Sequence, residues 1–235
     1  MLKILALGNS FSQDATAHLE KMTEGAYVRN LYIGGCSLER HANNLTAHET
    51  NYQYQKDGVK IEPGPDWVCA NDIFASKAWD VVTVQQVSQL SGLYETYEPH
   101  LGTVLGYIRK LCPTAKIVWH QTWAYAANST HEGFANYGRD QKRMLEMIEE
   151  TSHRVARENG LGLIEVGKAI QTLRAELEPD GTDLCRDGFH LSCDYGRYAA
   201  AYVWARYFGL PVKEEYLPDG ADPERIRRIR ELLSK

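Results

Sequence analysis

Short apolar runs alternate with longer amphipathic segments along most of the chain. Five runs have the length and apolar content of buried strands, and they cover residues 2–7, 27–33, 80–84, 116–120 and 161–166. Helical patterns predict helices at residues 13–24, 99–111, 137–159, 168–177, 195–207 and 223–233. Residues 38–52 are also interpreted as a helix, although the segment is polar and weakly patterned. Residues 54–65 carry the turn Lys56-Asp57-Gly58, which predicts a hairpin or excursion.

This alternation predicts an α/β fold. Helical crossovers join parallel strands, and a parallel sheet needs helices on both of its faces. We therefore expect a three-layer α/β/α sandwich around a five-stranded parallel sheet with flavodoxin-like winding. No linker of Gly, Ser and Pro and no internal repeat interrupts the pattern, so residues 1–235 are expected to form a single domain.

Net charge and cysteine content limit the kinds of partner the protein is expected to bind and the compartment in which it is expected to function. The net charge of −5 and the absence of a basic tract argue against nucleic acid or a membrane as partner. Five irregularly spaced cysteines without a Cys-x-x-Cys pair indicate reduced thiols in a cytoplasmic protein. The histidines lack metal-ligand spacing, so we expect neither a metal nor another cofactor. Association into a homo-oligomer is left open.

Polar and small residues gather where the predicted strands end. In sheets of this kind, ligands bind at the carboxyl ends of the strands. The segments at these ends are Gly8-Asn9-Ser10, Gly34-Gly35-Cys36-Ser37, residues 85–89, residues 120–123 and a late loop with Asp187 and His190.

Ser10 follows the first strand and precedes a helix, which allows two interpretations. Its hydroxyl could cap the helix, or it could attack a substrate if a base takes its proton. Asp187-Gly188-Phe189-His190 supplies such a base, because a carboxylate three residues before a histidine can orient one ring nitrogen and leave the other free. Together these residues favour a nucleophile, Ser10, served by His190 and Asp187.

The two segments together resemble blocks of the GDSL, or SGNH, hydrolase family. Gly8-Asn9-Ser10-Phe11-Ser12 is similar to the family's Gly-Asp-Ser-Leu-(Ser) block, with Asn for Asp and Phe for Leu. Asp187-Gly188-Phe189-His190 is similar to its final Asp-x-x-His block. The resemblance spans most of the chain and implies a flavodoxin-like fold and ester hydrolysis by a Ser-His-Asp triad.

The resemblance also implies donors for an oxyanion. The glycine block corresponds to Gly34-Gly35-Cys36-Ser37, where the backbone N–H of Gly35 would join that of Ser10. The family's third donor is an Asn after the third strand, and this chain has Gln85-Gln86-Val87-Ser88-Gln89 there. A glutamine amide can donate the same hydrogen bond. We favour Gln85, which ends the strand, over Gln89.

These features lead to one main hypothesis and two alternatives. The main one is hydrolysis of a small-molecule ester, with an acetyl group on a carbohydrate suggested by family analogy. The missing Asn motivates a non-catalytic carbohydrate-binding protein, and an acyltransferase would use the same triad. His120 and Trp123 are interpreted as core or rim residues, whereas a loop with Tyr125, His131 and Tyr137 could stack on a sugar ring.

Overall fold

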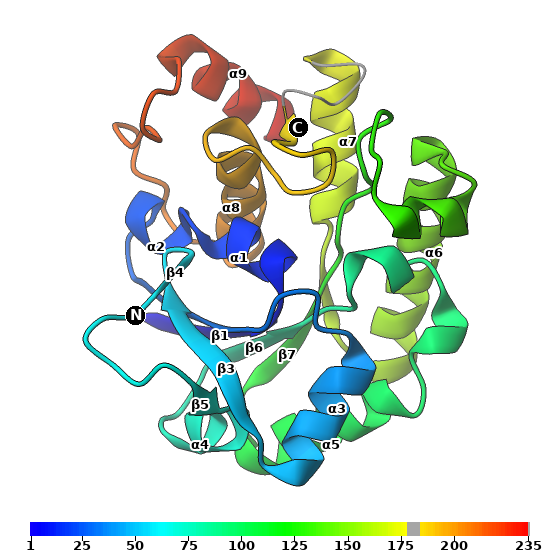
Figure 1. Cartoon of the computed structure of the whole chain (residues 1–235). Helices are drawn as coiled ribbons and strands as arrows, with labels where there is room; N and C mark the ends of the chain where they lie inside the picture. Colours follow the sequence, from blue (N-terminus) through cyan, green and yellow to red (C-terminus); the bar gives the residue numbers. More distant parts are fainter. Residues whose placement is uncertain (178–183, 235) are drawn as a thin grey trace.

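A central sheet with helices on both faces organises the molecule, as a computed structural model of residues 1–177 and 184–234 shows (Figure 1). Five parallel strands form its middle in the order β2-β1-β6-β7-β8. They are β1 (Leu2–Gly8), β2 (Ala26–Tyr32), β6 (Val81–Val84), β7 (Lys116–His120) and β8 (Gly162–Ile164). This order is the flavodoxin-like winding. The predicted α/β/α fold with five parallel strands is confirmed.

Three antiparallel strands extend the sheet beyond β2, and the prediction covered only the hairpin among them. They are β3 (Thr50–Lys56), β4 (Val59–Lys60) and β5 (Val68–Cys69). The helix expected over 38–52 ends at Ala47, and a strand begins at Thr50 because threonine and tyrosines alternate there with polar residues. The expected hairpin is confirmed, and its Asp57-Gly58 turn has positive φ at both residues.

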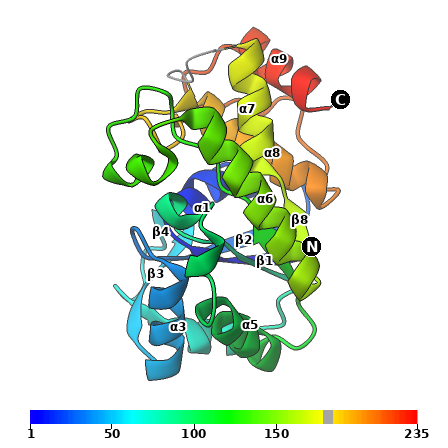
Figure 2. The same ribbon diagram turned by 90° about the vertical axis from the view of Figure 1, so that its right-hand side faces the viewer.

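Helices cover both faces of the sheet (Figures 1 and 2). One face carries α1 (Ser10–Thr16), α2 (Leu19–Met22), α7 (Val166–Glu176), α8 (Tyr195–Tyr207) and α9 (Pro223–Leu233). The other carries α3 (Leu38–Ala47), α4 (Ala70–Ala75) and α5 (His100–Leu111), while α6 (Gln141–Asn159) contacts β7 and β8. None of the helices in the described ranges is both long and apolar enough to cross a membrane.

The molecule has a hydrophobic core on each face of the sheet, and successive residues of a strand contribute to one core and then to the other. In β1, Ile4 and Ala6 enter the core under α8, whereas Leu5 and Leu7 enter the core over α3 and α5. The helix expected over 13–24 instead begins at Ser10, because the Asn9 side chain caps α1 by accepting the N–H of Phe11. That early start places Ser10 at the edge where the parallel strands end.

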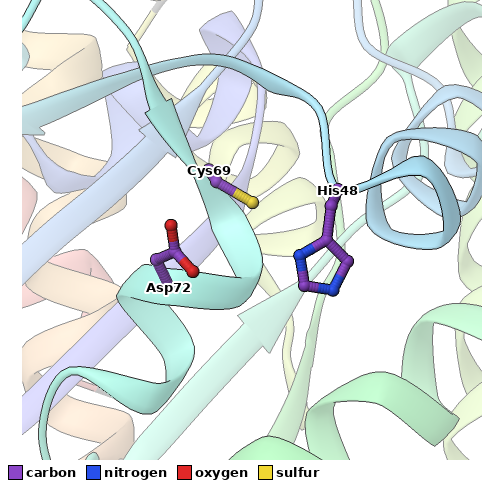
Figure 3. A group of neighbouring side chains, drawn as sticks. All are labelled: His48, Cys69 and Asp72. Carbon is purple, nitrogen blue, oxygen red and sulfur yellow. The ribbon is translucent and has the colours of Figure 1, made fainter.

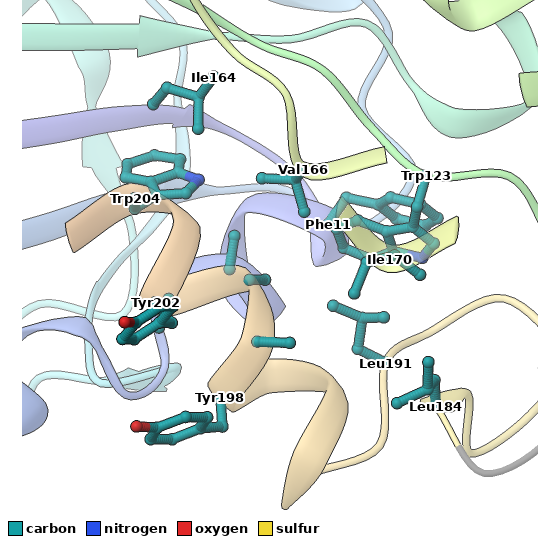
Figure 4. Close-up of a cluster of buried hydrophobic side chains, with 14 of the residues drawn as sticks. Phe11, Trp123, Ile164, Val166, Ile170, Leu184, Leu191, Tyr198, Tyr202 and Trp204 are labelled. Carbon is teal, nitrogen blue, oxygen red and sulfur yellow. The ribbon is translucent and has the colours of Figure 1, made fainter. Parts of the chain in front are cut away.

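An aromatic pair anchors the segments on either side of this edge (Figure 4). Phe11 stacks on the buried Trp123 with ring centroids 4.1 Å apart. The indole N–H of Trp123 donates to the backbone oxygen of Phe189 at 2.7 Å. Phe11, next to Ser10, and Phe189, next to His190, therefore both contact the Trp123 indole, one by stacking and one through its backbone oxygen.

Two enclosed histidines make the fold sensitive to acid. Burial lowers the pKa of His41 and of His120 to about 3, against about 6.5 in an unfolded chain. Between these values the unfolded state binds more protons, so stability falls as pH falls. We expect the free energy of unfolding to drop by about 2 kcal/mol per histidine between pH 7 and pH 5. Urea titrations at both pH values measure this drop.

The variant His120→Gln should lose about half of that dependence, since it removes one of the two groups. His153→Gln makes the same chemical change at an exposed position of α6 and controls for the substitution itself. An unaltered pH dependence in His120→Gln would contradict this account.

Candidate active site

Ser10, His190 and Asp187 meet at the carboxyl edge of the sheet. The Nε2 atom of His190 lies 2.8 Å from the Oγ atom of Ser10. The Nδ1 atom of His190 lies 2.6 Å from Oδ2 of Asp187. Because the carboxylate accepts the Nδ1 proton, Nε2 is left to accept the proton of the Ser10 hydroxyl. Ser10 and His190 lie 180 positions apart in the chain, and folding brings them together.

A tight turn holds Asp187 against His190. The Oδ1 atom of Asp187 accepts the backbone N–H of His190 at 2.8 Å and that of Phe189 at 3.2 Å. Gly188 has φ of +84°, and a Cβ there would lie 3.1 Å from Cα of Ser129. Burial alone would raise the pKa of Asp187, but the hydrogen bonds from His190 and Phe189 outweigh it and keep that pKa below its usual range. The carboxylate is therefore charged at neutral pH.

A pocket of about 340 Å³ opens at Ser10. Strand ends, the start of α1 and two loops line it. The lining residues are Asn9, Ser10, Gln13, Tyr32, Gly34, Gly35, Val87, Ser88, Gln89, His131, Arg186, Phe189 and His190. The volume is at the small end of ligand sites, which suits a short substrate group.

Two backbone donors are available beside Ser10. The N–H of Ser10 lies in the first turn of α1, where a helix offers no internal acceptor. Gly35 lines the pocket with φ of +60°. Among the described residues, no backbone carbonyl accepts a hydrogen bond from its N–H. Both groups can therefore donate to an oxygen atom in the pocket.

The structure corrects our preference between the two glutamines. Gln85 is buried and does not line the pocket. Its amide group donates to Oδ1 of Asn9, and its Oε1 lies 2.7 Å from Nδ1 of His120. The side chain continues the alternation of β6, which places it on the same face of the sheet as Val81, opposite to Val84. Gln89, in the 3₁₀ helix η1 (Ser88–Leu90), lines the pocket instead.

A loop from another part of the chain fixes Gln89. The backbone oxygen of Gln89 accepts from Nδ2 of Asn136 at 3.0 Å and from the Tyr137 hydroxyl at 3.2 Å. Gly133 lies so close that an added Cβ would be 2.3 Å from Cβ of Gln89. Sequence reasoning missed Gly133 and Asn136, because neither belongs to a motif or a periodic pattern.

The aromatic loop expected to face a sugar contributes one residue to the pocket. His131 lines it, whereas Tyr125 and Tyr137 are fully buried. The Nδ1 atom of His131 accepts the N–H of Gly133, so the ring proton sits on Nε2. Burial, with a smaller contribution from His190, lowers the pKa of His131 and favours its neutral form. The interpretation of this loop as a stacking surface is corrected for both tyrosines.

Asn9 connects the three strand ends around Ser10. Its Nδ2 donates to the Cys36 oxygen at 3.0 Å, while Oδ1 accepts from Phe11 N at 3.0 Å and from Gln85 Nε2 at 2.7 Å. An aspartate could accept the last two bonds, but it could not donate to Cys36. The carbonyl of Cys36 thus explains why asparagine stands at this position.

Asn9→Asp is expected to lower the free energy of unfolding by about 2 kcal/mol at pH 7, because a buried carboxylate would face the Cys36 carbonyl. Chemical denaturation checks this value. The exposed Asn128 provides the control, since Asn128→Asp makes the same chemical change in solvent. Equal stability of the two variants would show that the bond to Cys36 is unimportant.

One group of potential metal ligands lies outside the residues that line the pocket. Single atoms of His48, Cys69 and Asp72 lie within 4.8 Å of one another (Figure 3). The amide of Asn71 donates to Nε2 of His48 at 3.1 Å and to the Leu45 oxygen at 3.2 Å. The imidazole proton then occupies Nδ1, so neither nitrogen offers a free lone pair. A metal would have to displace this amide, and the arrangement does not favour one.

Comparison with known proteins agrees with the fold. Residues 3–229 match the family "Domain of unknown function (DUF4886)". A crystal structure of a DUF4886 family protein from Bacteroides uniformis is 36% identical, with a TM-score of 0.85 over 98% of this chain and 92% of that one. No match was found among curated proteins.

More distant structures share the fold. A protein of Slackia heliotrinireducens, provisionally named an SGNH hydrolase, is 23% identical, with a TM-score of 0.64 over 88% of this chain and 99% of that one. The acetyl xylan esterase AlAXEase is 15% identical, with a TM-score of 0.56 over 87% of this chain and 99% of that one.

Proposed function

Because the chain belongs to the DUF4886 family and has the fold of the SGNH hydrolases, we propose that it is a serine esterase acting on small acyl esters. One observation carries the proposal. The Ser10 hydroxyl lies 2.8 Å from His190 Nε2, with Asp187 on the other ring nitrogen, beside a pocket. This arrangement activates a serine for acyl transfer.

The reaction follows from the positions of these groups. Ser10 Oγ attacks the ester carbonyl while His190 Nε2 takes the hydroxyl proton, and Asp187 stabilises the resulting imidazolium. The oxyanion faces the N–H groups of Ser10 and Gly35 and the amide of Gln89. His190 then gives its proton to the leaving alcohol. Water attacks the acyl-serine with His190 as base, which releases the acid and restores Ser10.

The pocket favours a short acyl group on a polar alcohol. Its volume of about 340 Å³ must hold both parts of the ester around the reacting carbon. Gln13, Gln89 and Tyr32 are among its lining residues, and polar residues of this kind suit a hydroxylated alcohol. An acetylated carbohydrate meets both conditions, and the shared fold of an acetyl xylan esterase is an analogy in its support.

Turnover of a chain-length series tests the proposal. The purified protein should hydrolyse 4-nitrophenyl acetate with a kcat/KM at least about tenfold above that for the octanoate, because extra methylenes exceed the pocket. It should also release acetate from acetylated methyl glucoside. Preference for the octanoate would contradict the short-acyl assignment, and inactivity toward the whole series would contradict the esterase assignment.

Gln89→Ala is expected to lower kcat by a factor of about 10 to 1,000 with a much smaller change in KM, since an oxyanion donor acts mainly in the transition state. Steady-state kinetics on 4-nitrophenyl acetate measures both constants. Gln171→Ala on α7 is the matched control, as this side chain bonds only to Gln141 within the described residues. An equal kcat in both variants would remove Gln89 from the oxyanion site.

A further inference from the structure

One residue that lines the pocket is permanently charged, and its charge is positive. Arg186 is the one lysine, arginine or carboxylate residue among its lining residues, all of which are described. The chain as a whole has a net charge of −5, so this charge does not continue a generally basic surface. A lone guanidinium beside a nucleophile can select among substrates by their charge.

Arg186 is held in place by a buried carboxylate. Its Nη1 lies 3.1 Å from Oδ1 and 3.2 Å from Oδ2 of Asp14, and it also donates to the Leu191 oxygen. Asp14 is completely buried on α1, one turn after Ser10. These bonds fix the direction of the guanidinium, which reduces the entropy lost when it binds an anion.

The same carboxylate is shared with a second arginine. Arg197 Nε donates to Oδ1 of Asp14 at 2.8 Å, and the N–H of Leu191 donates to Oδ2 at 2.9 Å. Two guanidinium groups and one carboxylate leave one positive charge in excess. Within the described residues, no second carboxylate lies within 4.0 Å of either arginine.

The excess charge is accessible at the pocket. The Arg186 side chain is 32% exposed and lines the pocket, whereas Arg197 is 20% exposed and does not line it. A partly desolvated, oriented guanidinium binds carboxylates through paired N–H donors more strongly than an exposed one does. A substrate group with negative oxygens would complete the charge balance around Asp14.

We propose that Arg186 determines specificity by binding a carboxylate carried by the ester substrate. This proposal rests on the esterase function proposed above and adds the chemical class of the substrate. The carboxylate would belong to the acyl part, as in a half-ester of a dicarboxylic acid, or to the alcohol part, as in an acylated sugar acid. In either case hydrolysis consumes one ester bond and one water and leaves the recognised carboxylate unchanged.

Two matched pairs of esters show whether the recognised carboxylate lies on the acyl part or on the alcohol part of the substrate. The first pair is mono-4-nitrophenyl adipate and its methyl ester, which differ in charge on the acyl side. The second is 4-acetoxybenzoate and its methyl ester, which differ on the alcohol side. We expect the charged member of one pair to have a kcat/KM about tenfold or more above its neutral partner. The pair that shows this ratio identifies the part that carries the carboxylate.

Three variants distinguish binding of the substrate from support of the loop. Arg186→Gln should reduce the charged-to-neutral ratio about tenfold, mainly through KM, and Arg186→Lys should keep part of it because the charge remains. Arg197→Gln removes the other partner of Asp14 but lies outside the pocket, so it should lower the ratio less than Arg186→Gln does. A purely structural role of Arg186 would lower both rates together and would leave the ratio unchanged.

The proposal is overturned if neither pair shows a preference for the charged ester, or if Arg186→Gln keeps the wild-type ratio. Turnover of the neutral esters reports on the esterase function separately. If no ester is hydrolysed, calorimetric titration with adipate against dimethyl adipate tests the site alone. Binding of adipate that is lost in Arg186→Gln would then support the carboxylate site, and absence of binding would refute it.

Discussion

Replacing Ser10 with alanine is expected to lower kcat for 4-nitrophenyl acetate by a factor of about 10⁴ or more. The variant has no oxygen to attack the ester, and the neighbouring groups provide only the weak acceleration of an oriented oxyanion site. The Ser10 hydroxyl bonds to His190 and to no other described side chain, so its removal should leave the fold intact. Initial rates and far-UV circular dichroism of the same preparation check both statements.

Ser76→Ala is the control for this change. Ser76 is exposed at the end of α4, outside the residues that line the pocket. The control should therefore have the wild-type kcat. If Ser10→Ala and Ser76→Ala were equally active, Ser10 would be a helix-start residue and another group would perform the chemistry.

Changing Asp187 to asparagine is expected to lower kcat by a factor of about 10³ to 10⁴. An amide cannot stabilise the imidazolium, and its N–H₂ group can donate to Nδ1 of His190. The ring proton would then move to Nε2, which could no longer accept the proton of Ser10. Steady-state kinetics across pH 6 to 9 measures the loss and shows whether it changes with pH.

The exposed Asp140, which caps α6, offers a comparison for this substitution. Asp140→Asn should retain activity within a small factor, because an asparagine side chain can also cap a helix. A loss below about tenfold in Asp187→Asn would mean that His190 does not depend on the carboxylate for its orientation.

The parallel part of the fold was predictable because its strands are short and mostly apolar, with helical segments between them. β7 lies at residues 116–120, as expected, and α8 and α9 have the expected bounds. The antiparallel extension was not predictable in the same way. Its strand β3 alternates polar and aromatic residues directly after a helix, and helix and strand patterns overlap in such a short segment.

Some residues of the site were predictable from the sequence, and others were not. Ser10, Asp187 and His190 were found because they lie in compact segments with a known chemical logic. Gln89 was ranked second because the direction of a side chain beyond a strand end depends on the turn that follows. Arg186 carried no signal in the sequence, since its significance comes from Asp14, which lies 172 positions away in the chain.

The central claim is that Ser10 is the activated nucleophile of this protein. Incubation with a fluorophosphonate, followed by mass spectrometry of the tryptic peptide spanning residues 4–21, tests it most directly. This account predicts one adduct, located on Ser10 and not on Ser12 by fragmentation, and absent from Ser10→Ala. An unlabelled peptide, or an adduct at another residue in a preparation that hydrolyses 4-nitrophenyl acetate, would contradict it.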